Sequence, residues 1–70
     1  MKMKPYERYK QVLNFITAYS ASNHEAPTIM EIGRHVGMSS SASVFNVLIA
    51  LEALGLIRRT RKWRGIEIVK

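Results

Sequence analysis

Cysteine is absent from the sequence, and its absence excludes several kinds of chemistry. Without thiols the chain forms no disulfide, holds no thiolate zinc site and performs no cysteine-based catalysis. A composition free of cysteine also fits a reducing compartment, so we expect a cytoplasmic protein.

The sequence also lacks a hydrophobic run of membrane-spanning length. Its longest apolar stretch, near residues 47–51, stops at Glu52, whereas a span needs about 18 to 20 apolar residues. A secretory signal is not predicted either, because residues 5–8 are Pro-Tyr-Glu-Arg where the apolar run of a signal would stand. We therefore expect a soluble protein with no membrane partner.

Titratable groups are few and show no catalytic pattern. His24, His35 and five scattered acids provide neither metal-ligand spacing nor a nucleophile beside a base, and the His24-Glu25 pair lacks the second histidine of a zinc-protease helix. The sequence predicts no enzyme, no metal, no cofactor and no small-molecule ligand.

Basic residues, by contrast, are abundant and clustered. The 70 residues suffice for one domain, 1–70, with a formal net charge of +6 and an isoelectric point near 10.2. One group consists of Arg58, Arg59, Arg61, Lys62 and Arg64, and a second of Lys2, Lys4, Arg8 and Lys10. Clustered cations favour a nucleic-acid partner because binding releases condensed counterions, although a solvated basic surface remains the alternative.

Apolar periodicity predicts a first helix over about residues 5–22. Pro5 suits its first turn, and its buried face consists of Tyr9, Val12, Leu13, Ile16 and Tyr19. Residues 23–27 break the pattern.

A capping box, Thr28 with Glu31, predicts a short second helix over about 28–36 that ends at Gly37. Gly33 inside this helix costs up to about 1 kcal/mol relative to alanine, and a close helix crossing is the expected reason.

A third helix is predicted over about 40–54, capped by Ser39 or Ser40 and ended by Gly55. Its inward stripe is Val44, Val47, Leu48, Leu51 and Leu54. The short turn containing Gly37 makes the second and third helices a helix-turn-helix.

Beyond Gly55 the period changes to the alternation of strands, as in Ile66-Glu67-Ile68, which predicts a hairpin over about 56–69 with a basic tip. The predicted fold is mainly α with a small β-hairpin: a three-helix winged helix-turn-helix.

The outward face of the third helix is the expected reader of double-stranded DNA. It consists of Ala42, Asn46, Ile49 and Ala53, flanked by Ser43 and Phe45. Asn46 is the leading base-reading candidate because its amide pairs with adenine, although it could be merely solvated. Ile49 could touch a thymine methyl, whereas packing is the first expectation for Phe45.

The remaining predicted contacts flank this face. Ser39, Ser40 and Ser41 could hold a phosphate or a base edge at the helix start, with capping as the alternative for at least one of them. In the hairpin, Arg58, Arg59, Arg61, Lys62 and Arg64 could approach the backbone or a narrow minor groove. Trp63 could contact sugars or anchor the hairpin.

The segment Ala26-Pro27-Thr28-Ile29-Met30-Glu31-Ile32-Gly33, together with Gly55-Leu56-Ile57 and Arg64-Gly65-Ile66, resembles the amino-terminal domain of LexA repressors from about Tyr9 to Val69. This resemblance implies a bacterial or phage repressor of the SOS type that binds a palindromic operator, with contacts at Ser40, Ala42, Ser43, Phe45 and Asn46. Phe45 and Asn46 stand where the enterobacterial pattern has two acidic residues.

The chain contains no counterpart of the self-cleaving and dimerising domain of LexA repressors, so we expect no cleavage by this chain alone. It is either a fragment of a longer repressor or a stand-alone regulator, with a homodimer on DNA as one arrangement.

A protein-interaction module that uses Phe45 and Ile49 is the second hypothesis. Binding of RNA or single-stranded DNA is the third, disfavoured because no exposed aromatic platform is evident.

Overall fold

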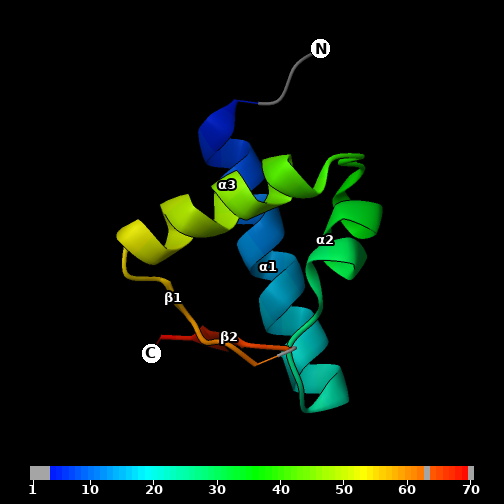
Figure 1. The fold of residues 1–70 in the computed structure, drawn as a ribbon, viewed down its shortest axis with the longest axis vertical. Helices are drawn as coiled ribbons and strands as arrows, with labels where there is room; N and C mark the ends of the chain where they lie inside the picture. The colour runs from blue at the N-terminus through cyan, green and yellow to red at the C-terminus, as the bar shows by residue number, and fades with distance from the viewer. Residues whose placement is uncertain (1–3, 63, 70) are drawn as a thin grey trace.

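The computed structural model describes residues 4–62 and 64–69. In these residues α1 (Pro5–Asn23), α2 (Ile29–Val36) and α3 (Ser41–Ala53) precede the strands β1 (Ile57–Arg59) and β2 (Ile66–Ile68). Figure 1 shows α3 crossing over α1, with α2 near the start of α3 and the hairpin below the end of α3. The predicted fold class, a winged helix-turn-helix, is confirmed.

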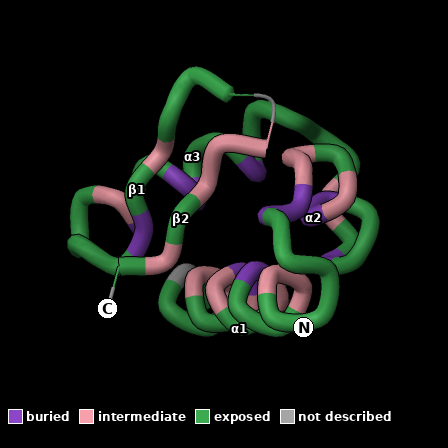
Figure 2. Tube along the Cα trace, turned by 90° about the horizontal axis from the view of Figure 1, so that it is seen from below, coloured by how far each residue is buried: buried purple, intermediate pink, exposed green. Residues whose placement is uncertain are grey.

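The core lies where the three helices and β1 meet. Val12 and Ile16 of α1 are fully buried, and they pack with apolar residues of α2, α3 and β1. Figure 2 shows buried segments on all three helices, while the end of the hairpin is exposed. A single small core therefore fixes the positions of α3 and the hairpin.

Local signals determine how α2 begins and ends. The Thr28 hydroxyl accepts a hydrogen bond from the Glu31 backbone N–H, and the Glu31 carboxylate accepts one from Thr28, so the predicted capping box is present. Gly37 ends α2 in the left-handed region, with φ of 76°. Glycine adopts this conformation without the steric cost that a Cβ imposes.

The turn after Gly37 bends the chain by 100° between α2 and α3. This angle lies within the range of about 90–120° that is typical of a helix-turn-helix. No single helix among the described residues is long and apolar enough to cross a membrane, and α2 and α3 reach that length and composition only when taken together across the bend.

Gly33 lies at a close approach of α2 to the turn and to α3. A Cβ at this position would stand 2.9 Å from the Met38 carbonyl oxygen and 3.2 Å from Cγ2 of Val44 in α3. The predicted reason for a glycine inside α2 is therefore correct, and the contact involves the turn as well as the next helix.

The predicted inward stripe of α3 ends earlier than the sequence pattern indicated. Leu51 is 1% exposed, but Leu54 is 62% exposed, so its assignment to the core was wrong. Leu54 is the C-cap of α3, and the backbone N–H groups of Gly55 and Leu56 bond back to Glu52 and Leu51 in a Schellman motif. This reversal places Ile57 of β1 in the core instead.

The hairpin consists of two antiparallel strands in which Ile57, Arg58 and Arg59 face Ile68, Glu67 and Ile66. Ile57 is buried, and the two isoleucines of β2 pack partly buried against the core. The hairpin is thus attached to the body by one apolar face.

Candidate nucleic-acid interface

The exposed side of α3 presents the residues that the sequence predicted for DNA reading. All eight residues are exposed, on α3 or just before it: Ser39, Ser40, Ser41, Ala42, Ser43, Phe45, Asn46 and Ile49. The opposite side of α3 holds Val44, Val47, Leu48 and Leu51 in the core. This division leaves a continuous surface of small, polar and apolar side chains, which suits contact with base edges in a major groove.

The three serines before and at the start of α3 differ in their roles. Ser40 is the N-cap, and its hydroxyl accepts a hydrogen bond from the Ser43 backbone N–H at 3.4 Å. The Ser39 and Ser41 side chains are exposed beside the free N–H groups of the first turn. Those N–H groups and the positive end of the helix dipole favour an anionic oxygen at this position.

Phe45 is covered on one face by a cation. The guanidinium carbon of Arg59 lies 4.6 Å from the centre of the Phe45 ring, and Phe45 as a whole residue remains 41% exposed. The packing role expected for Phe45 therefore takes the form of a contact with the hairpin. Ile49, one turn further along α3, is 44% exposed.

The five predicted hairpin cations fall into two groups. Three of them form ion pairs: Arg58 with Glu67 at 2.7 Å, Arg59 with Glu52 at 3.0 Å, and Arg64 with Glu31 at 2.7 Å. Arg61 and Lys62 are exposed, and neither forms an ion pair within the described part of the chain. Two cations at the hairpin tip, Arg61 and Lys62, thus remain available to a polyanion.

Two of these ion pairs change the acidity of their carboxyl groups. The hydrogen bond from Arg64, followed by that from the Thr28 backbone, lowers the pKa of Glu31 from 4.5 to about 2. Hydrogen bonds from the side chain and backbone of Arg59 lower the pKa of Glu52. Both carboxylates are therefore charged at neutral pH and hold the hairpin cations that face them.

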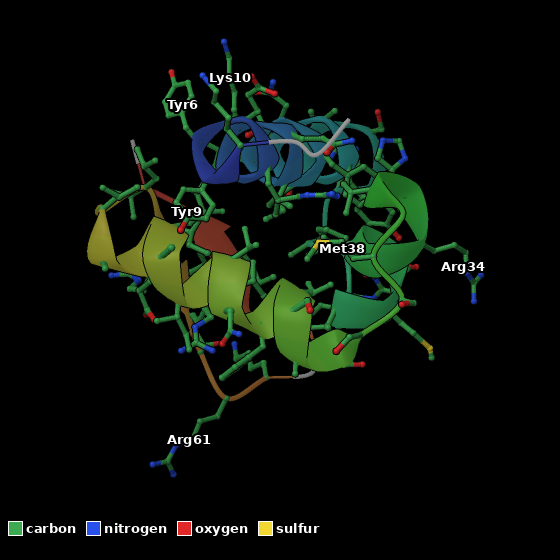
Figure 3. The ribbon with its side chains drawn as sticks, turned by 90° about the horizontal axis from the view of Figure 1, so that it is seen from above. Tyr6, Tyr9, Lys10, Arg34, Met38 and Arg61 are labelled. Atoms are coloured by element: carbon green, nitrogen blue, oxygen red, sulfur yellow. The ribbon has the colours of Figure 1, made fainter. Side chains whose placement is uncertain are left out.

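The tip cations and the start of α3 line the same hollow. The residues that line it are Thr28, Ile29, Met30, Ser41, Arg61 and Lys62. In Figure 3, Arg61 projects on the side of the molecule opposite Tyr6 and Lys10 of α1. The fold therefore brings α3 and the hairpin tip together on one face.

Among the described residues of the amino-terminal basic group, neither Lys10 nor Arg8 is directed at the hollow. Lys10 points away from it in Figure 3, and the Arg8 guanidinium donates to the Val36 carbonyl oxygen at 2.8 Å. Arg8 thus caps the end of α2. Lys2 and Trp63, which the sequence analysis also considered, lie outside the described residues.

Sequence reasoning missed the acidic partners of the hairpin. Glu67 faces Arg58 in the strand register, so the hairpin pattern alone could have indicated that pair. Glu31 and Glu52 approach their arginines only through the tertiary fold, from helices 33 and 7 residues away in sequence. No local pattern signals those two contacts.

Comparison with known proteins agrees with this geometry. A family model described as the LexA DNA-binding domain matches residues 3–64. The LexA repressor of Bacillus subtilis (strain 168) is 44% identical over 64 residues, covering 90% of this chain and 31% of that protein. LexA repressor 1 of Geobacter sulfurreducens is 43% identical over 63 residues, covering 89% and 31%. The LexA repressor of Syntrophomonas wolfei is 41% identical over 58 residues, covering 83% and 28%. The chain thus spans less than a third of the length of these relatives.

Proposed function

The chain belongs to the family of LexA DNA-binding domains, and from this premise we propose that it binds a palindromic operator in double-stranded DNA and represses transcription. Two copies occupy the two half-sites, because a two-fold symmetric site matches a pair of identical reading helices. The proposed place of action is the cytoplasm, at the nucleoid.

The observation that carries the proposal is the shared position of α3 and the hairpin tip. The exposed face of α3 fits the major groove, and Ser41 at its start lines the same hollow as Arg61 and Lys62. A duplex that accepts α3 would therefore meet both tip cations at its sugar-phosphate backbone. These contacts supply affinity, whereas the groove contacts of α3 supply sequence preference.

Asn46 is the proposed base reader at the centre of this face. Its carboxamide offers one donor and one acceptor, which match N7 and the N6 amino group of adenine. Ala42 and Ile49 flank it on the exposed side, and their apolar surfaces suit thymine methyl groups. Ser39 and Ser41 are the proposed phosphate contacts at the start of α3.

The competing hypothesis is a protein-interaction module that uses Phe45 and Ile49. The Arg59 guanidinium already covers one face of the Phe45 ring, which reduces the apolar area available to a protein partner. DNA binding is favoured because the tip cations have no role in that alternative.

Selection from a randomised duplex library tests the proposed function without assuming an operator sequence. The enriched duplexes are expected to be palindromes, and fluorescence anisotropy should show tighter binding to them than to scrambled duplexes of equal composition. On the selected duplex, Asn46→Ala should weaken binding by about 1–3 kcal/mol, the discrimination that a good bidentate pair provides.

The matched control is Asn14→Ala, which removes the same side chain from an exposed position of α1 and should leave affinity unchanged. Failure to enrich any duplex would contradict the proposal, as would equal affinities for selected and scrambled DNA. Binding to neither at low salt would favour the interaction module.

A further inference from the structure

The hairpin is too short to hold its own position. Each strand contains three residues, and an isolated two-stranded hairpin is only marginally stable in water. Its placement beside α3 therefore depends on contacts with the helices. Ile57 provides a buried anchor at one end of β1, and Arg59 bonds to Glu52 of α3 at the other end.

Arg64 provides the corresponding anchor just before β2. Its Nη1 donates to Oε1 of Glu31 at 2.7 Å, to the Ala26 carbonyl oxygen at 3.0 Å and to the Tyr19 hydroxyl at 3.3 Å. Its Nη2 donates to the second oxygen of Glu31 at 3.4 Å, and its Nε lies 3.4 Å from a carboxylate oxygen of Glu25. One side chain thus joins the hairpin to α1, to α2 and to the segment between them.

The carboxylate that receives Arg64 is held in place by other bonds. Glu31 accepts from the Thr28 backbone N–H at 2.8 Å within the capping box, and the Tyr19 hydroxyl donates to it at 3.2 Å. Each of the two oxygens thus accepts a hydrogen bond that does not come from Arg64. The planar fork of arginine matches a fixed carboxylate in a way that the single ammonium of lysine does not.

Arg64 also differs from its neighbours at the tip in exposure. Its side chain is 26% exposed, whereas Arg61 and Lys62 are exposed and form no ion pair within the described residues. A phosphate could take over both terminal nitrogens of Arg64 only if the guanidinium left Glu31, and that would leave a partly buried carboxylate without its main partner.

We propose that Arg64 is a positioning residue for DNA binding and not a DNA contact: it fastens the hairpin to the start of α2 and thereby sets where Arg61 and Lys62 meet the phosphates beside α3. The proposal rests on the proposed function, because the positioned cations matter only if the partner is DNA. If the hairpin is loose in the free protein, binding must also order it, and this ordering reduces the free energy of binding. A hairpin that is already fastened avoids that cost.

Three variants test the proposal: Arg64→Ala, Arg64→Lys, and Arg61→Ala as the matched loss of an arginine from the same loop. The first measurement needs no DNA. The Thr60 amide donates to the Gly65 carbonyl oxygen across the base of the loop, so its hydrogen exchange reports opening of the hairpin. Both Arg64 variants should exchange this amide at least about fivefold faster, and Arg61→Ala should match the wild type.

The second measurement is affinity for the selected duplex at several salt concentrations, with each variant shown to be fully helical by circular dichroism. Arg61→Ala should lower the slope of log K against log salt by about 0.9, because one phosphate contact is lost. Both Arg64 variants should keep the wild-type slope and bind at least about fivefold more weakly at every salt concentration. A purely structural role for Arg64 would leave the affinity of the folded protein unchanged.

Three results would overturn the proposal. Arg64→Ala could lower the salt slope by about 0.9 while Thr60 stays protected, which would identify a direct phosphate contact. Arg64→Lys could retain wild-type affinity, or both Arg64 variants could leave Thr60 exchange unchanged. A wild-type chain that binds no duplex would overturn the proposed function instead, and the exchange comparison would still decide whether Arg64 fastens the hairpin.

Discussion

A methyl group added at Gly33 tests the packing of α2 against the turn and α3. In Gly33→Ala the new Cβ would stand 2.9 Å from the Met38 carbonyl oxygen, which belongs to the backbone of the turn and cannot rotate away. It would also stand 3.2 Å from Cγ2 of Val44, a side chain that is itself buried. Both neighbours must therefore shift if the helix is to stay in place.

Two opposing effects set the size of the change. Alanine is favoured over glycine inside a helix by about 1 kcal/mol, whereas overpacking of a tight contact costs about 1–3 kcal/mol. Because one of the two neighbours is backbone, we take the upper end of the cost and expect a net loss of about 2 kcal/mol. For a domain of this size that loss lowers the melting temperature by roughly 8–16 °C.

Thermal unfolding followed by circular dichroism measures this effect. Arg34→Ala, at the next position of α2, is the control because its side chain points into solvent in Figure 3, and we expect a change within about 0.5 kcal/mol. A Gly33→Ala variant as stable as the wild type, or more stable, would refute the packing argument.

Two further predictions concern stability. The hydrogen bond from Arg64 lowers the pKa of Glu31 in the folded chain from its ordinary 4.5 to about 2. The folded state therefore binds fewer protons than the unfolded state between these two values, and its stability should fall as the pH drops through this interval. Urea unfolding across that range should show a smaller fall for Glu31→Gln, and an equal fall in both proteins would show that this carboxylate is not responsible. Leu51→Ala should cost about 2–5 kcal/mol because Leu51 is buried, whereas Leu54→Ala should cost less than about 1 kcal/mol because Leu54 lies on the surface. Equal losses in urea unfolding would mean that the stripe of α3 does extend to Leu54.

The parts of the fold that the sequence predicted are those specified by neighbouring residues. The capping box joins Thr28 to a glutamate three positions later, and Gly37 ends α2 through its own backbone freedom. Helical periodicity likewise identified the buried side of α3, which consists of Val44, Val47, Leu48 and Leu51. These signals lie within one or two helical turns, so a single sequence contains them.

The errors and omissions concern contacts between distant segments. Periodicity carries the stripe of α3 on to Leu54, but it cannot show that the chain reverses there and that Ile57 takes the next core position. In the same way, a run of cations in the hairpin looks uniform until the fold brings Glu31 to Arg64 and Glu52 to Arg59. The distinction between paired and available cations depends on tertiary structure.

The central claim is that α3 and the hairpin tip together form the DNA-binding face, and amide chemical-shift mapping with the selected duplex tests it most directly. The claim predicts that the largest shifts fall on Ser41, Asn46, Arg61 and Lys62, while the amide of Lys10 on the opposite side of the molecule stays unchanged. Shifts confined to the exposed side of α1, or to α3 without the hairpin tip, would contradict it.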